Sequence, residues 1–168
     1  MANLAFIGLG SNLQAPVRQL QRATTVINEL PDTRVLDNSS MYRSAPLGCV
    51  EQAGLVNPDF VNAVIKIETT LSPQALLQAL LDIEHQQGRE RTFRNAPRTL
   101  DLDVLLYDDM QMHEHGLTIP HPQMHMRAFV LHPLLEISPE IKIPGIGSAK
   151  LALDNCTDQV LERIVDAV

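Results

Sequence analysis

The feature that most constrains the fold of this chain is the segment at residues 100–107, which reads Leu-Asp-Leu-Asp-Val-Leu-Leu-Tyr. Its first half alternates apolar and acidic residues, which is typical of a strand with one face toward solvent. Its second half is apolar at successive positions, which indicates burial on both faces. We therefore predict a strand that begins near the surface and continues into a core.

Three strands and two helices are predicted before this segment. The strands are expected at residues 3–9, 33–44 and 59–68. The first helix is expected at residues 14–30, where apolar residues recur at helical spacing and Pro31 follows. The second helix is expected to start with Ser72 as its N-cap and Pro73 at its first position, and to stop at Gly88.

These segments follow the order β-α-β-β-α-β, which predicts an α+β fold. We expect a ferredoxin-like sandwich, in which both helices pack on one face of an antiparallel sheet. A C-terminal extension should add short strands near 110–119 and 141–143 and helical segments near 125–137 and 157–167. Without repeats, low-complexity tracts or Ser/Gly linkers, residues 1–168 are expected to form a single domain.

Composition and charge exclude several classes of partner. The net charge of −7 argues against nucleic acid and anionic membranes, which a negative field repels. No run is long and apolar enough to cross a bilayer, and the N-terminal apolar run lacks the basic stretch of a secretory signal. Cys49 and Cys156 are far apart and show no metal-type spacing, which favours a reducing compartment. We expect a cytoplasmic monomer.

Asp101 and Asp103 are the first candidates for chemistry. Residues two apart on a strand point to the same face and lie roughly 7 Å apart. Two carboxylates at that spacing can hold Mg²⁺, which uses one or two carboxylates together with substrate phosphates. A solvated strand face is the alternative, but acids at the entrance of a buried strand are unfavourable without a partner.

A basic segment precedes the two acids. Residues 89–98 contain one acid and four arginines, namely Arg89, Arg91, Arg94 and Arg98. Arginine grips phosphate oxygens through a planar fork, so arginines beside a magnesium site suit a nucleoside triphosphate. The chain lacks G-x-x-x-x-G-K-[ST] and G-x-G-x-x-G loops. Residues 45–58, rich in Pro, Gly and Asn, are expected to form a long functional loop.

Four further residues could contact a substrate. His121 could bind phosphate or transfer a proton, although a surface-turn histidine is the ordinary alternative. Phe60 and Phe129 could stack on a planar ligand or belong to the core. Asn62 follows Phe60 by two residues, so its amide could hydrogen-bond the same planar ligand. The other histidines fit no zinc spacing and are interpreted as solvated or packing residues, among them His113, His115, His125 and His132.

Residues 94–106, Arg-Asn-Ala-Pro-Arg-Thr-Leu-Asp-Leu-Asp-Val-Leu-Leu, resemble the signature of the 6-hydroxymethyl-7,8-dihydropterin pyrophosphokinase family. The resemblance covers nearly the whole chain except about the last twenty residues. Further corresponding segments are residues 7–13, 42–48, 60–63, 84–89 and 117–122.

The resemblance implies a ferredoxin-like fold with three mobile loops, and transfer of pyrophosphate from ATP to the pterin hydroxymethyl group, with AMP released. It implies two Mg²⁺ ions on Asp101 and Asp103, with Arg94 and Arg98 also catalytic. It assigns ATP binding to Glu84, Arg89, Arg91, Arg98, Thr118, His121 and Arg127. It assigns pterin binding to Ser44, Ala45, Leu47, Phe60, Asn62 and Phe129.

The chain departs from the family pattern at Asn95, Ala96, Gly116 and Pro122. Gly116 stands where relatives can carry an ATP-binding arginine, so we expect weaker nucleotide binding than in those relatives. Two alternatives stay open. One is another magnesium-dependent phosphoryl or nucleotidyl transferase on the same fold, and the other is a non-catalytic paralogue that binds pterin or nucleotide.

Overall fold

The central sheet has the strand order β10-β3-β4-β1-β5, and β2 also pairs with β4. The computed structural model describes residues 2–44, 60–89, 100–114 and 116–164. In chain order, the described elements begin with β1 (Asn3–Ser11), α1 (Pro16–Asn28), β2 (Thr33–Asn38), β3 (Met41–Ser44), β4 (Phe60–Thr69), α2 (Pro73–Arg89) and β5 (Leu100–Tyr107). Then follow β6 (Met112–Glu114), β7 (Leu117–Ile119), the 3₁₀ turn η1 (Met124–Met126), α3 (Ala128–Ile137), β8 (Lys142–Ile143), β9 (Gly147–Ser148), α4 (Ala149–Asp154) and β10 (Leu161–Ile164).

Every neighbouring pair in the central sheet is antiparallel. β4 pairs with β1 along its length on one side, and with β3 and then β2 on the other. The single strand predicted at residues 33–44 is therefore two strands, separated at Ser39 and Ser40. Ser39 bridges the break, because its amide donates to the Val64 carbonyl and its Oγ accepts from the Val64 amide, each at 2.9 Å.

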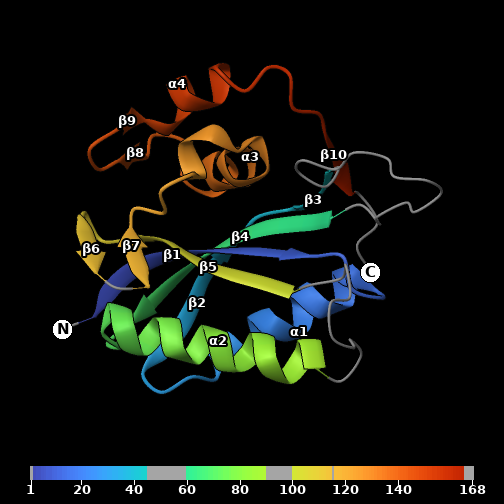
Figure 1. Cartoon of the computed structure of the whole chain (residues 1–168), viewed down its shortest axis with the longest axis vertical. Helices are drawn as coiled ribbons and strands as arrows, with labels where there is room; N and C mark the ends of the chain where they lie inside the picture. Colours follow the sequence, from blue (N-terminus) through green and yellow to red (C-terminus); the bar gives the residue numbers. More distant parts are fainter. Residues whose placement is uncertain (1, 45–59, 90–99, 115, 165–168) are drawn as a thin grey trace.

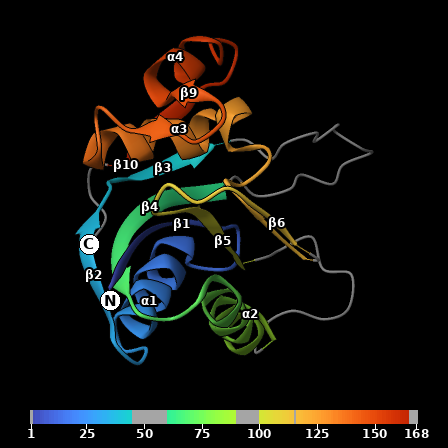
Figure 2. The same cartoon turned by 90° about the vertical axis from the view of Figure 1, so that its left-hand side faces the viewer.

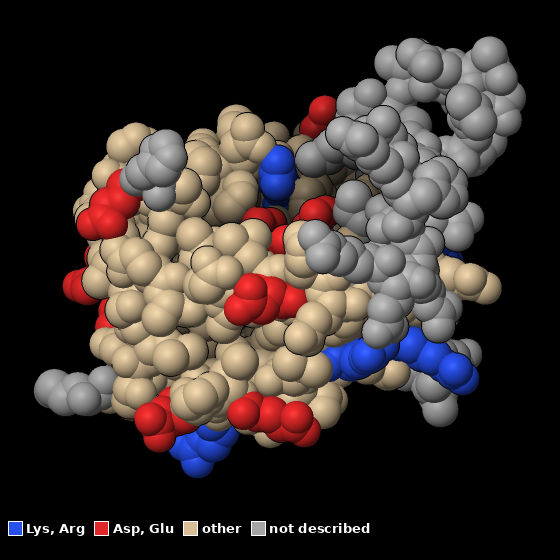
Figure 3. All heavy atoms as spheres, turned by 60° about the horizontal axis from the view of Figure 1, so that its bottom comes forward, with Lys and Arg blue, Asp and Glu red and all other residues tan. Residues whose placement is uncertain are grey.

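Two layers of helices enclose the sheet. α1 and α2 lie side by side on one face, as predicted, and α3 and α4 lie on the other (Figures 1 and 2). On the side of the molecule that carries α1 and α2, charged side chains are scattered over a largely uncharged surface (Figure 3). In the described part of the chain, no helix is long and apolar enough to cross a membrane.

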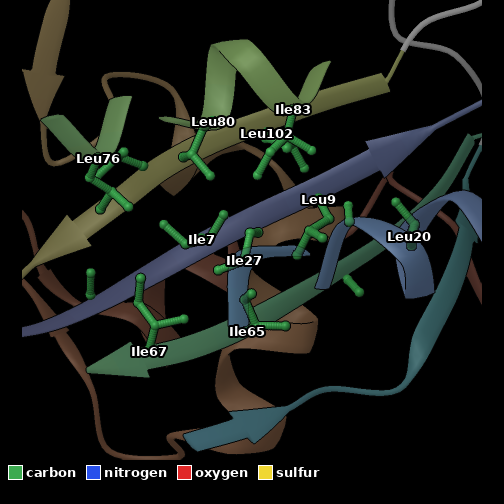
Figure 4. Packing of buried hydrophobic residues seen from close by; sticks show 14 of the residues in the cluster. Ile7, Leu9, Leu20, Ile27, Ile65, Ile67, Leu76, Leu80, Ile83 and Leu102 are labelled. Carbon is green, nitrogen blue, oxygen red and sulfur yellow. The ribbon is translucent and has the colours of Figure 1, made fainter. Parts of the chain in front are cut away.

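Alternate residues of the strands supply two separate cores. Toward α1 and α2, side chains such as Ile7, Ile65 and Leu102 pack against Leu20, Leu80 and Ile83 of the helices (Figure 4). Toward α3, Phe6, Val64 and Leu105 pack against Leu131 and Leu134. The apolar second half of β5 is thus buried on both faces, which confirms that prediction.

Ser72 caps α2, because its Oγ accepts a hydrogen bond from the Ala75 amide at 3.2 Å. The stop predicted at Gly88 is wrong, since the helix continues to Arg89. A single glycine weakens a helix interior by only about 1 kcal/mol, which surrounding structure can offset.

The helix predicted at residues 157–167 is also wrong. The C-terminal helix is α4, where Ser148 Oγ accepts from the Leu151 amide at 3.3 Å as an N-cap. Residues 161–164 form β10, which pairs with β3 at the edge of the sheet. Long-range strand pairing overrode the local apolar pattern there.

Candidate active site

Three residues define a line across the α3 face of the sheet. Gly10 of β1 lies opposite Asn62 of β4 on one side and opposite Asp101 of β5 on the other. Residues directly opposite each other in neighbouring strands point to the same face. Because Val64 on the same side of β4 packs under α3, this is the face that α3 partly covers.

Gly10 lies between Asn62 and Asp101 and has no side chain of its own on this face. A Cβ atom added there would lie 3.0 Å from Asn62 Oδ1 and 3.9 Å from Phe60 Cδ1. Phe60 and Asn62 therefore both reach over Gly10, as their spacing on a strand predicts. A side chain at this position would therefore crowd the Asn62 amide.

Asn62 is held in place from the neighbouring strand. Its Nδ2 donates a hydrogen bond to Ser44 Oγ at 2.7 Å, and both residues are buried. Ser44 in turn lies opposite Phe60 in the pairing of β3 with β4. The structure thus brings together three of the residues predicted to bind the pterin.

Asp101 and Asp103 lie opposite Gly10 and Gly8 at the last strand of the sheet path, with Asp101 exposed and Asp103 half-buried. Between them, the Leu102 amide donates to Glu84 Oε2 of α2 at 2.6 Å. Burial raises the pKa of Glu84 to about 7, the Leu102 hydrogen bond opposes this rise, and the charges of the two aspartates add to it. The carboxylates of Asp101 and Asp103 are therefore close enough to Glu84 to influence its pKa.

A cleft of about 620 Å³ opens beside Asp103, between α2 and the β6–β7 hairpin. It brings together Thr118 and His121, which were predicted to bind ATP, and Asp103, which was predicted to bind Mg²⁺. Gly116 also lines it, with φ +80° and no atom within 4 Å of the position that a Cβ would take. The remaining lining residues are Leu77, Val104, His113, Glu114, Leu117 and Pro122.

His113, interpreted from the sequence as a solvated or packing residue, is exposed and also lines the cleft. His113 lies opposite Thr118 in the hairpin, and its Nδ1 is 3.0 Å from Thr118 Oγ1. The hairpin explains why His113 lies at the cleft. Residues that face each other across two paired strands point to the same side, so a residue opposite Thr118 lines the same space.

His121 is fixed by its backbone and its ring. Its amide donates to the Leu105 carbonyl at 3.0 Å, and its Nδ1 accepts from the Gln123 amide at 3.2 Å. Burial lowers its pKa, the Asp103 charge opposes that change, and the Arg127 charge adds to it. A neutral ring that accepts at Nδ1 carries its proton on Nε2, where it can donate to an anion.

Arg127 and Phe129 stand at the start of α3. The Arg127 guanidinium donates to Gln123 Oε1, and its central carbon lies 5.5 Å from the centroid of the Phe129 ring. The predicted residues Ala45, Leu47, Arg91, Arg94 and Arg98 lie outside the described residues, as does the side chain of Arg89.

Comparison with known proteins gives a family match and several similar sequences. The family described as 7,8-dihydro-6-hydroxymethylpterin-pyrophosphokinase matches residues 6–139. A 2-amino-4-hydroxy-6-hydroxymethyldihydropteridine pyrophosphokinase of Haemophilus influenzae is 50% identical over 141 residues, which cover 84% of this chain and 85% of the relative. A protein of the same description from Pseudomonas aeruginosa is 40% identical over 167 residues, which cover 99% of this chain and 100% of the relative.

A solved structure described as Plasmodium falciparum HPPK-DHPS shares the fold. It superposes with a TM-score of 0.70 at 14% identity, and the match covers 92% of this chain and 45% of that longer chain. At this identity the likeness concerns the fold alone. It supports the mixed α/β architecture with an antiparallel sheet.

Proposed function

The chain belongs to the 7,8-dihydro-6-hydroxymethylpterin-pyrophosphokinase family, and we propose that the α3 face of β4, β1 and β5, with the adjoining cleft, is its active site. The protein is an ATP-dependent diphosphotransferase. It transfers pyrophosphate from ATP to the hydroxymethyl group of 6-hydroxymethyl-7,8-dihydropterin in folate synthesis. ATP is the co-substrate, so AMP is the other product.

The observation that carries the site assignment is the shared register of Asn62 and Asp101 about Gly10. Two strand spacings separate them, which is about 10 Å between backbones. A pterin ring bound at Asn62 and lying along Gly10 would direct its hydroxymethyl arm toward the aspartates. The cleft that holds a nucleotide begins at Asp103, so the two substrates would meet over β5.

In the pterin half, the residues have distinct roles. Asn62, fixed by Ser44, would hydrogen-bond the edge of the heterocycle with its amide. Phe60 and Phe129 would stack on the ring. Ala45 and Leu47 are assigned to the same pocket by the family resemblance.

In the nucleotide half, neutral His121 would donate from Nε2 to a phosphate oxygen, and Thr118 would donate from its hydroxyl. Arg127 would pair with phosphate charge through its fork. Arg89, Arg91, Arg94 and Arg98 would neutralise the charge that develops on the bridging phosphates, as phosphoryl transfer requires. Glu84, which the family resemblance assigns to ATP binding, would lie beside Asp101 and Asp103 through its hydrogen bond with the Leu102 amide.

Two Mg²⁺ ions are proposed at Asp101 and Asp103. The donor chemistry fits, since both groups are carboxylates on one face of β5, and Mg²⁺ is usually bound by one or two carboxylates together with substrate phosphates. Bound magnesium would supply charge neutralisation and alignment for the attacking and leaving oxygens. The protein residues would then hold the substrate hydroxyl in line with the β-phosphorus of ATP.

Several broader assignments stay proposals. The strand order β5-β1-β4-β3, with α1 and α2 on one face, supports a ferredoxin-like classification. A single domain over residues 1–168, a monomeric state, a cytoplasmic location and the lack of a nucleic-acid partner stay predictions from the sequence.

The decisive experiment is to mix the protein with ATP, Mg²⁺ and 6-hydroxymethyl-7,8-dihydropterin and to identify the nucleotide product. AMP that forms only when the pterin is present is the expected result. Release of ADP or pyrophosphate would indicate another transferase, and tight binding without turnover would indicate a non-catalytic binder.

A further inference from the structure

Arg127 occupies the N-cap position of α3 without acting as a cap. Its backbone is extended, with φ −122° and ψ 108°, and its side chain makes no capping hydrogen bond. An N-cap side chain normally accepts from a free amide of the first helical turn. An arginine has no acceptor and also places positive charge at the positive end of the helix dipole. The start of α3 therefore needs an acceptor from elsewhere.

Gln159 supplies that acceptor and a second bond with it. Its Oε1 accepts from the Ala128 amide, and its Nε2 donates to the Met126 carbonyl, each at 2.8 Å. The two bonded backbone groups belong to the residues immediately before and after Arg127. The Gln159 side chain thus hydrogen-bonds the backbone on both sides of Arg127. This restricts the backbone conformation at Arg127 and hence the direction of its side chain.

These two hydrogen bonds come from a distant and anchored part of the chain. Gln159 lies 31 residues after Ala128 and outside the segment 6–139 that matches the family. The backbone amide of Gln159 donates to the Cys156 carbonyl at 3.1 Å, and Cys156 is buried in the core to which α3 and α4 contribute. The C-terminal extension therefore reaches back to the site through a fixed support.

The side chain of Arg127 is held between two partners on its own segment. Gln123 Oε1 accepts a hydrogen bond from the guanidinium, whose central carbon lies 5.5 Å from the centroid of the Phe129 ring. These contacts set where the guanidinium sits only if the backbone at residues 126–128 stays in place. Positioning of a charged group within a fraction of an ångström is what phosphate recognition requires.

We propose that Gln159 is a positioning residue for nucleotide binding, which acts through the backbone on both sides of Arg127. This inference rests on the proposed function in one respect, the assignment of Arg127 to ATP. Through Gln159, the C-terminal extension contributes to the proposed nucleotide site.

The test is a double-mutant cycle on the full chain, read as the Kd for ATP with Mg²⁺ in the absence of the pterin. Gln159→Met has nearly the shape of glutamine but makes neither hydrogen bond. It should weaken ATP binding roughly tenfold, the size of effect expected from a lost positioning contact. In an Arg127→Ala background the same change should alter the Kd by less than about twofold, because the residue through which it acts is gone.

A control variant and a second Gln159 variant separate positioning from general destabilisation. Asn155→Ala removes an exposed side chain whose amide donates only within α4, to the Leu151 carbonyl. It should leave the ATP Kd unchanged even if it lowers the thermal midpoint. If Gln159→Met fails to fold, Gln159→Asn keeps the amide but is one methylene too short to bridge both groups, and it should show the same loss of ATP affinity.

The outcomes distinguish the two levels of the proposal. If Arg127→Ala weakens ATP binding while the Gln159 variants bind as the wild type does, the positioning role is overturned and the Arg127 assignment stands. Full additivity of the two losses also overturns the positioning role. If Arg127→Ala binds ATP normally, the Arg127 assignment itself is overturned, and the role of Gln159 with it.

Discussion

Asn62 Oδ1 lies where it would be only 3.0 Å from a Cβ atom at Gly10. Gly10→Ala should therefore push the Asn62 amide out of its position. The expected result is roughly tenfold weaker pterin binding, the cost of about one misplaced hydrogen bond. Titration of the pterin measures this. The Kd for ATP alone serves as the control and should not change, and an unaltered pterin Kd would contradict the placement of the ring over Gly10.

Asp101→Asn and Asp103→Asn should each reduce turnover by at least ~100-fold, because a neutral amide is a poor ligand for Mg²⁺ and a poor source of charge stabilisation. Unfolding midpoints should stay close to that of the wild type, since both residues sit at the solvent-facing end of β5. Asp109→Asn is the matched control, an exposed acid two residues beyond the same strand. Near-normal turnover in either aspartate variant would remove the magnesium assignment.

The raised pKa of Glu84 makes a prediction about stability. Because burial raises its pKa from 4.5 to about 7, the folded state binds a proton that the unfolded state releases between these values. The contribution of Glu84 to the free energy of unfolding should therefore fall as pH rises from about 4.5 to about 7.

Glu84→Gln keeps an acceptor for the Leu102 amide but does not titrate, so its stability should fall less over that range. Urea unfolding of both proteins at a series of pH values measures the difference. Parallel stability profiles would show that Glu84 titrates normally in the folded protein.

Gly116 lines the nucleotide cleft, and space is free where its side chain would begin. Gly116→Arg should bind ATP roughly tenfold more tightly, since a charge-assisted hydrogen bond contributes about 1.5–3 kcal/mol before ordering costs. Its positive φ will strain any substituted residue. Gly116→Ala carries the same strain without the charge and isolates the effect of the guanidinium. Equal ATP affinities for wild type and Gly116→Arg would contradict the prediction that an arginine at this position strengthens nucleotide binding.

Much of the fold could be predicted because its signals are local. β5 begins and ends where predicted, since the alternation and then the apolar run describe how that strand meets solvent and core. The start of α2 was also correct, because a capping serine acts within one turn. β10 could not be predicted, since pairing of residues 161–164 with β3 is a contact between distant segments.

The same division applies to the site. Asp101 and Asp103 could be found because their spacing alone places them on one face. Asn62 could be named, but its location across Gly10 from Asp101 depends on strand register. Gln159 gave no signal in the sequence, because its role comes from two backbone contacts made far along the chain.

α3 covers only part of its face of the sheet, and this affects how bound substrates change the stability of the protein. α3 packs over Phe6, Val64 and Leu105, and the site residues come next along the same strands. A bound pterin and nucleotide would thus extend the second layer of the sandwich where the described helices stop. Substrates that serve as part of the architecture stabilise it by mass action. The free energy of unfolding would then be highest when both substrates are bound.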